Sequence, residues 1–117
     1  MQVTNVLAVL MVDDFEVAAP WYARFFGRGP DRRPMASCAE WQLAEGGSVQ
    51  VFGAGESPGG STVVLGVDDV DARASELGDR GINVDVFTTP DGQFRLASAS
   101  DPAGNTVMLG QSITVPA

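Results

Sequence analysis

At 117 residues the chain is long enough for one compact domain and too short for two ordinary ones. Its basic residues are seven arginines with no lysine, and the net charge of −8 opposes the counterion release that drives nucleic-acid binding, so DNA, RNA and anionic membranes are poor partners. The absence of histidine excludes serine and cysteine triads, imidazole acid–base catalysis and nearly all zinc sites.

The first predicted elements are a strand, a helix and three further strands. Residues 3–11, VTNVLAVLM, alternate β-branched and other apolar side chains, which favours a strand. Asp14 is placed to cap a helix. Because Pro20 has no N–H to donate, we expect the regular helix to begin near residues 17–19, with Pro20 in its first turn, and to run to Gly27. Short strands are then expected over residues 34–38, 40–44 and 48–52.

The same plan recurs after a linker. Residues 53–61, GAGESPGGS, hold no apolar anchor and are predicted to be flexible. Asp69 then takes the place of Asp14, between a strand at 61–66 and a helix at 70–80 that stops at Gly81. Three more strands are expected over residues 83–88, 93–99 and 105–111. The sequence therefore predicts a single α+β domain of two β-α-β-β-β modules, about residues 1–53 and 61–112.

Strand periodicity separates two faces in each predicted sheet. One face is aliphatic, with Ala8 and Leu10 in the first strand and Val107 and Leu109 in the last, and it must pack beneath the helices. The other face mixes amide, hydroxyl, thioether and aromatic groups. Small-molecule sites are mostly apolar with a few placed polar groups, so this mixed face is the candidate site. A loosely filled interior or a dimer interface explains the pattern equally well.

Three segments resemble the glyoxalase/bleomycin-resistance family, also called the vicinal oxygen chelate superfamily. DFEVAAPWYARFFGR is similar to the first helix of the family, VDDVDARASELGDRGI to its second helix, and DPAGNTVML to its last turn and strand. The resemblance covers nearly the whole chain. It implies two β-α-β-β-β modules that curl into a cupped mixed sheet around a central cavity, and it implies a homodimer.

Enzymes of this family hold a divalent metal ion with four side chains, typically histidine or glutamate. The resemblance places those positions at Leu7, Gln50, Thr62 and Met108, all on the mixed face. A divalent cation prefers carboxylate, imidazole or thiolate ligands; leucine and methionine offer none of these, and an amide with a hydroxyl binds too weakly alone. We therefore expect no metal ion and no other cofactor.

The resemblance then points to the metal-free branch, which contains antibiotic-binding proteins that protect by sequestration. The leading hypothesis is a metal-independent homodimer that sequesters a hydrophobic or aromatic metabolite or antibiotic. The acidic charge also favours a cationic ligand, although solubility is its commoner cause. Aromatic rings would stack on the ligand, and the amide and hydroxyl would orient it. The expected ligand-binding residues are Leu7, Trp41, Gln50, Phe52, Thr62, Phe94 and Met108.

Some assignments stay open at this point. Trp41 fits dimer-interface packing as well as ligand stacking, and Arg95 fits a surface or helix-capping role better than an acidic ligand. A metal-independent isomerase, lyase or ring-modifying enzyme is the main alternative, but it would need Glu40 or Glu45 to reach the mixed face as a base, so no catalytic residue is assigned. A protein-binding or assembly surface is the third possibility.

Localisation follows from what the chain lacks. The N-terminus has no basic region or apolar core of a signal peptide, and the longest apolar run is far shorter than the roughly 20 residues that cross a bilayer. Cys38 is the only cysteine, so an internal disulfide is impossible. We expect a soluble cytoplasmic protein.

Overall fold

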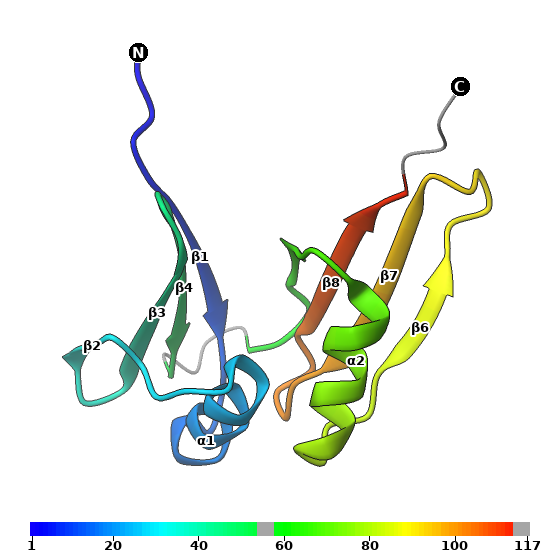
Figure 1. Cartoon of the computed structure of the whole chain (residues 1–117). Coiled ribbons are helices and arrows are strands. Elements are labelled where there is room, and N and C mark those ends of the chain that lie inside the picture. Colours follow the sequence, from blue (N-terminus) through cyan, green and yellow to red (C-terminus); the bar gives the residue numbers. More distant parts are fainter. Residues whose placement is uncertain (54–57, 114–117) are drawn as a thin grey trace. The chain divides into compact units, whose positions relative to one another are not determined.

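The computed structural model describes residues 1–53 and 58–113, and the chain divides into two compact units (Figure 1). The first unit comprises Met1–Ser61 together with Asp101–Asn105, and the second comprises Thr62–Ser100 and Thr106–Ala117. Each unit contains one helix and one mixed four-stranded sheet. This element order confirms the predicted α+β fold with two β-α-β-β-β modules. No helix in the described ranges combines the length and apolar character that a membrane span requires.

The first sheet has the strand order β1-β4-β3-β2. Strand β1 pairs parallel with β4, and β3 pairs antiparallel with both β4 and β2. Helix α1 lies beside this sheet (Figure 1). The elements are β1 (Val6–Met11), α1 (Phe15–Phe26), β2 (Arg32–Met35), β3 (Cys38–Ala44) and β4 (Gly47–Phe52).

The second sheet repeats this topology with the order β5-β8-β7-β6. Strand β5 pairs parallel with β8, and β7 pairs antiparallel with β8 and β6, so the repeat that the sequence predicts is present in the fold. The elements are β5 (Thr62–Gly66), α2 (Val70–Asp79), β6 (Asp85–Thr88), β7 (Phe94–Ser100) and β8 (Thr106–Ser112).

Both helices begin at the predicted aspartate caps. The Asp14 carboxylate accepts the Val17 N–H at 3.2 Å, and the Asp69 carboxylate accepts the Ala72 N–H at 3.1 Å. Each bond satisfies one of the free donors of a first helical turn. Helix α2 also stops where predicted, since Gly81 follows its last residues with a φ of 78°.

The predicted late start of α1 is wrong. The helix begins at Phe15 and includes Pro20 in its interior. Proline removes the hydrogen bond to the carbonyl of Glu16, four residues earlier, but both residues are exposed, so water can hydrate that carbonyl. The Asp14 cap and the buried aromatic face of the helix outweigh one lost bond.

The break between the first two strands of the hairpin also differs from the prediction. Strand β2 covers Arg32–Met35 rather than 34–38, and β3 begins at Cys38 rather than at residue 40. Met35 pairs with Cys38, so the chain turns at the two residues between them. The pairing partner, rather than Pro34, therefore fixes this boundary.

The two cores differ in composition. Under α1 the core is aromatic, with the Trp21 ring 5.3 Å from that of Phe25 and the Phe26 ring 5.3 Å from that of Trp41. Under α2 it is aliphatic and includes Leu77 of the helix and Val107 of β8. The helix-facing sides of both sheets are thus buried, as the periodicity predicts.

Candidate ligand-binding faces

Each sheet has one face toward its own helix, and we call the opposite face its open face. On the first sheet the register aligns three rows of open-face residues across the strands. Leu7 and Val9 belong to two of these rows and are 41% and 43% exposed. The rows are Leu7–Ser48–Gln42, then Val9–Gln50–Glu40–Arg32, then Met11–Phe52–Cys38–Met35.

The middle row carries the polar groups of this face. The Gln50 amide nitrogen donates to Oε1 of Glu40 at 3.4 Å, and Nη1 of Arg32 lies 3.5 Å from Oε2. The side chain of Glu40 is only 14% exposed, whereas that of Arg32 is 68% exposed. Glu40 is therefore a shielded carboxylate on the open face. Sequence periodicity did not assign it to a face, because its side depends on the register of β3 against β4, which shifts between Gln42 and Ala44.

Cys38 lies in the next row and is buried. Its thiol is 1% exposed, and burial raises its pKa, with a smaller contribution from the nearby Glu40 charge. A thiol with a raised pKa is a poor nucleophile near neutral pH. Phe52, its cross-strand neighbour, is half-buried on the same face.

The open face of the second sheet is more apolar. Val64, Phe87 and Phe94 are 57%, 40% and 44% exposed. Gly110 has no side chain on this face, and Val64 and Leu96 pack close to its backbone. A Cβ at this position would lie 3.2 Å from the side chain of Val64 and 3.4 Å from that of Leu96. The rows here include Val64–Met108–Ser98–Asp85 and Gly66–Gly110–Leu96–Phe87.

The sequence did not predict two residues of this second open face. Phe87 is opposite Leu96, and Asp85 is opposite Ser98 in the row of Met108. The predicted strand over residues 83–88 contained both, but four paired residues are too few to show a period-two pattern. Their side became evident only from pairing with β7.

Six of the seven predicted ligand-binding residues are on the open faces. Within the first unit these are Leu7, Gln50 and Phe52, and within the second they are Thr62, Phe94 and Met108. The parity argument therefore assigned five of these side chains to the correct face of their own sheets; it did not cover Phe94, which is on β7.

Trp41, the seventh, is on the helix-facing side. It is opposite Val49, is 0% exposed, and packs against the ring of Tyr22 at a centroid distance of 6.2 Å. Its Nε1–H donates to the carbonyl oxygen of Arg28 at 3.0 Å. A buried tryptophan with a satisfied N–H is a core residue. The predicted stacking of Trp41 on a ligand, and its alternative at a dimer interface, both conflict with this position.

Arg95 also faces the helix rather than a ligand. It is opposite Gln111 and forms a two-pronged ion pair with Asp71 in the first turn of α2, at 2.9 and 3.3 Å. Its Nη1 also donates to Thr88 at 3.1 Å. The hydrogen bonds from Arg95 lower the pKa of Asp71. This is the helix-bridging role that the sequence favoured.

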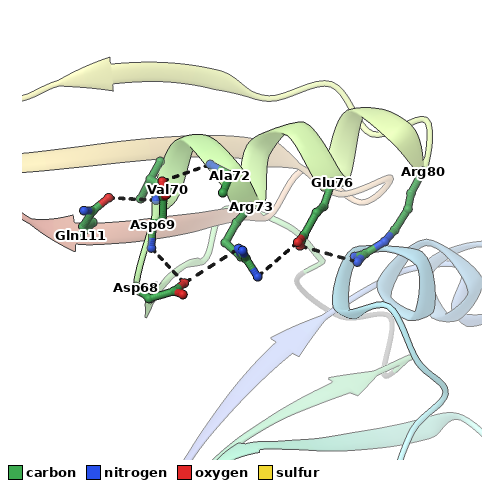
Figure 2. A network of polar contacts seen from close by, with 8 residues as sticks. All are labelled: Asp68, Asp69, Val70, Ala72, Arg73, Glu76, Arg80 and Gln111. Carbon is green, nitrogen blue, oxygen red and sulfur yellow. Dashed lines mark hydrogen bonds and ion pairs between the residues drawn. The ribbon is translucent and has the colours of Figure 1, made fainter.

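Further polar contacts surround the same helix (Figure 2). The side-chain oxygen of Gln111 accepts the Val70 N–H at 2.9 Å, which satisfies another free donor of the first turn. Arg73 lies between Asp68 and Glu76, with ion pairs at 3.8 and 3.2 Å. The Gln111 bond caps α2, the exposed ion pairs contribute little, and all these groups are on the side of the second sheet away from its open face.

The chemistry of the side chains does not fit a divalent metal ion. The four positions at which the resemblance implies metal ligands, residues 7, 50, 62 and 108, carry leucine, glutamine, threonine and methionine. Among residues 1–53 and 58–113, no group of three or more aspartate, glutamate, cysteine or histidine side chains is arranged to hold a metal. Glu40 supplies one carboxylate beside Gln50, which is too few ligands for a Ca²⁺, Mg²⁺ or Zn²⁺ site.

Known structures resemble this fold closely. No family model matches the sequence, and no curated protein matches it. A glyoxalase/bleomycin resistance protein from Catenulispora acidiphila is 32% identical, with a TM-score of 0.85 over 96% of this chain and 98% of that one. An antibiotic binding protein from Streptomyces sp. CB03234 is 29% identical, with a TM-score of 0.76 over 93% and 95%. A lactoylglutathione lyase from Agrobacterium tumefaciens shares the fold at 19% identity and a TM-score of 0.75 over 91% of each chain.

Proposed function

The chain belongs to the glyoxalase/bleomycin resistance protein family, and we propose that it binds a hydrophobic or aromatic small molecule and sequesters it without a metal ion. The observation that carries this proposal is the pair of open faces. Large apolar side chains, among them Leu7, Val64 and Phe94, are between 41% and 57% exposed there, interleaved with a few polar groups. Burying such side chains beneath a ligand contributes about 25 cal/mol per Å² of apolar area.

The proposed ligand contacts combine rings with hydrogen-bonding groups. On the first open face Phe52 would stack on a flat ligand, and Gln50 would orient it through an amide hydrogen bond. On the second open face Phe94 would stack on a flat ligand, Phe87 extends the apolar surface beside it, and Thr62 would orient the ligand through its hydroxyl. Leu7 on the first face and Met108 on the second would supply adaptable apolar contacts, at positions where the resemblance implies metal ligands in enzymes of the family.

Antibiotic binding by a relative supports the choice of ligand class. The Streptomyces protein that is 29% identical to this chain is an antibiotic binding protein, and its match spans 95% of its length. Sequestration needs affinity but no base, nucleophile or metal, which agrees with a chain that has no histidine and a buried cysteine. We also propose that the protein acts as a cytoplasmic homodimer; light scattering coupled to gel filtration tests the dimer.

Thermal unfolding against a panel of aromatic antibiotics tests the proposal. A true ligand at a hundredfold excess over its Kd stabilises the folded state by about 2.7 kcal/mol, so the melting temperature should rise. Phe52→Ala should reduce the rise for a ligand of the first open face, and Phe94→Ala should reduce it for a ligand of the second. Val17→Ala is the matched control for the first unit, because Val17 is an exposed apolar residue of α1, which packs on the face of the first sheet opposite its open face. A panel in which no compound shifts the melting temperature would contradict the proposal.

A metal-independent isomerase or lyase is the second candidate function. It is favoured by the position of Glu40, a shielded carboxylate on the open face that a general base would require. The test uses a bound compound with an acidic C–H in D₂O. A base at Glu40 should exchange that hydrogen for deuterium, and Glu40→Gln should abolish the exchange while the compound still binds. Binding without exchange by the unmodified protein would leave sequestration as the function.

A further inference from the structure

We propose that Glu40 selects ligands that carry a protonated amine beside their aromatic or apolar part. This inference rests on the proposed function, because it names the chemical class that the same open face would accept. Glu40 is therefore inferred to be a specificity-determining residue. It contacts Gln50 and Arg32 in the middle row of the first sheet.

The carboxylate has spare capacity to accept hydrogen bonds. An ionised carboxylate offers about four acceptor positions on its two oxygens. In the described part of the chain Glu40 has one contact on each oxygen, and both are long, at 3.4 Å from Gln50 and 3.5 Å from Arg32. A ligand ammonium group can therefore bind at shorter distance without displacing a strong internal bond.

Arg32 does not cancel this capacity. Its side chain is 68% exposed, and a 3.5 Å contact from such a side chain contributes little, because water screens the pair and the long side chain must be ordered. Glu40 itself is 14% exposed. A ligand over the face would remove the remaining water, and charge attraction strengthens as the local dielectric constant falls.

The neighbours of Glu40 fix where the rest of the ligand lies. Along each strand the next open-face position is about 7 Å away, since side chains alternate between faces. On β4 that neighbour of Gln50 is Phe52, and Val9 lies opposite Gln50 on β1, 43% exposed. An ammonium at Glu40 thus places a ring within reach of Phe52 and Val9. A carboxylate on the ligand would instead be repelled.

Asp85 is the other carboxylate on an open face, and it is a weaker candidate. It lies on the edge strand β6 and is exposed, with no contact recorded among the residues that the structure covers. Water and salt therefore screen its charge. Glu40 differs because its side chain is only 14% exposed, so water and salt screen its charge less.

Three naphthalene compounds of similar shape test the inference: the amine 2-naphthylmethylamine, the alcohol 2-naphthalenemethanol and the carboxylate 2-naphthaleneacetate. Their affinities for the whole chain are measured by calorimetry or by NMR titration at neutral pH. We expect the amine to bind about tenfold more tightly than the alcohol, as for a charge-assisted hydrogen bond, and the acetate to bind most weakly. Glu40→Gln should remove the preference for the amine by lowering the affinity for the amine about tenfold, toward that for the alcohol.

Matched variants separate a local from a global effect. Glu45→Gln removes the same charge from an exposed position in the same hairpin and should keep the preference. Arg32→Gln removes the competing cation and should strengthen amine binding severalfold. Equal binding of amine and alcohol, or a preference lost in Asp85→Asn but kept in Glu40→Gln, would overturn the role of Glu40 alone. Failure of all three compounds, and of the antibiotic panel, would overturn the proposed function and this inference with it.

Discussion

Tyr22 donates a 2.7 Å hydrogen bond to Oδ2 of Asp101, and both side chains are buried although 79 residues separate them. Asp101 also accepts the backbone N–H of Asn105 at 2.8 Å, and the Asn105 amide donates to the carbonyl oxygen of Met11 at 2.8 Å. The turn DPAGN, which leads from β7 into β8, therefore belongs to the first unit through its contacts. A turn that looked local in the sequence is part of a buried polar network.

Tyr22→Phe should destabilise the protein by about 1–3 kcal/mol, because it removes a donor from a buried carboxylate while keeping the aromatic ring. The loss should be measured as a lower urea midpoint with an unchanged slope. Ser112→Ala removes an exposed hydroxyl and should change stability by less than about 0.5 kcal/mol. An unchanged midpoint for Tyr22→Phe would show that the network contributes nothing.

Tyr22 should resist ionisation in the folded state. Burial, followed by its hydrogen bond to Asp101, raises the pKa of this phenol well above 10. The unfolded chain releases the proton near pH 10, so above that pH the unfolded state binds fewer protons and folding stability falls as pH rises. Tyr22 is the only tyrosine, so phenolate absorbance reports it alone and should appear only as the protein unfolds. Smooth ionisation near pH 10 with the fold intact would contradict this.

Local patterns predicted much of the fold. The aspartate caps and the glycine after α2 act within a few residues, so their effects are legible in the sequence. The strand periodicity assigned Leu7 and Met108 to the correct faces because their strands are long and regular. The network of Tyr22 and Asp101 was not predictable, since no local pattern links residues so distant in sequence.

The side of β3 was the feature that the sequence left undetermined. The face of each β3 side chain depends on the register of β3 against β4, and that register shifts between Gln42 and Ala44, next to the turn. After this shift Trp41 is opposite Val49 and faces the helix, whereas Glu40 is opposite Gln50 and faces away from it. One register therefore removed an expected ligand contact and supplied the carboxylate on which the further inference rests.

Trp41 and Phe94 should give opposite results when substituted. Trp41→Phe should lower the free energy of unfolding by about 1–3 kcal/mol, because it removes core volume and the donor to the Arg28 carbonyl oxygen. It should leave ligand affinity unchanged. Phe94→Ala should cost less than about 1 kcal/mol, since Phe94 is 44% exposed, but it should weaken ligand binding. Denaturation and calorimetry on both variants check this, and the reverse pattern would refute the assignment of faces.

Arg95 should matter to α2 and to the titration of Asp71, but not to the ligand. Arg95 lowers the pKa of Asp71, so the ionised carboxylate contributes stability above the ordinary aspartate pKa, and this contribution is lost as pH falls through the lowered value. In Arg95→Gln the pKa of Asp71, followed by NMR, should return toward its ordinary range. Ligand affinity should stay the same; weaker binding of the aromatic compounds would show that Arg95 contacts them.

The purified protein should not retain divalent metal. After incubation with Zn²⁺, Mn²⁺ or Ni²⁺ and gel filtration, elemental analysis should find much less than one ion per chain, because Gln50 and Thr62 are weak ligands and Leu7 and Met108 supply no suitable donor. The control is a double variant, Val9→His with Gln50→Glu. Both positions are in the row of Glu40 on the open face of the first sheet, so the variant brings one imidazole and two carboxylates together and should take up Zn²⁺. A stoichiometric ion in the unmodified protein would refute metal independence, and its loss in Gln50→Leu would place that ion on the open face.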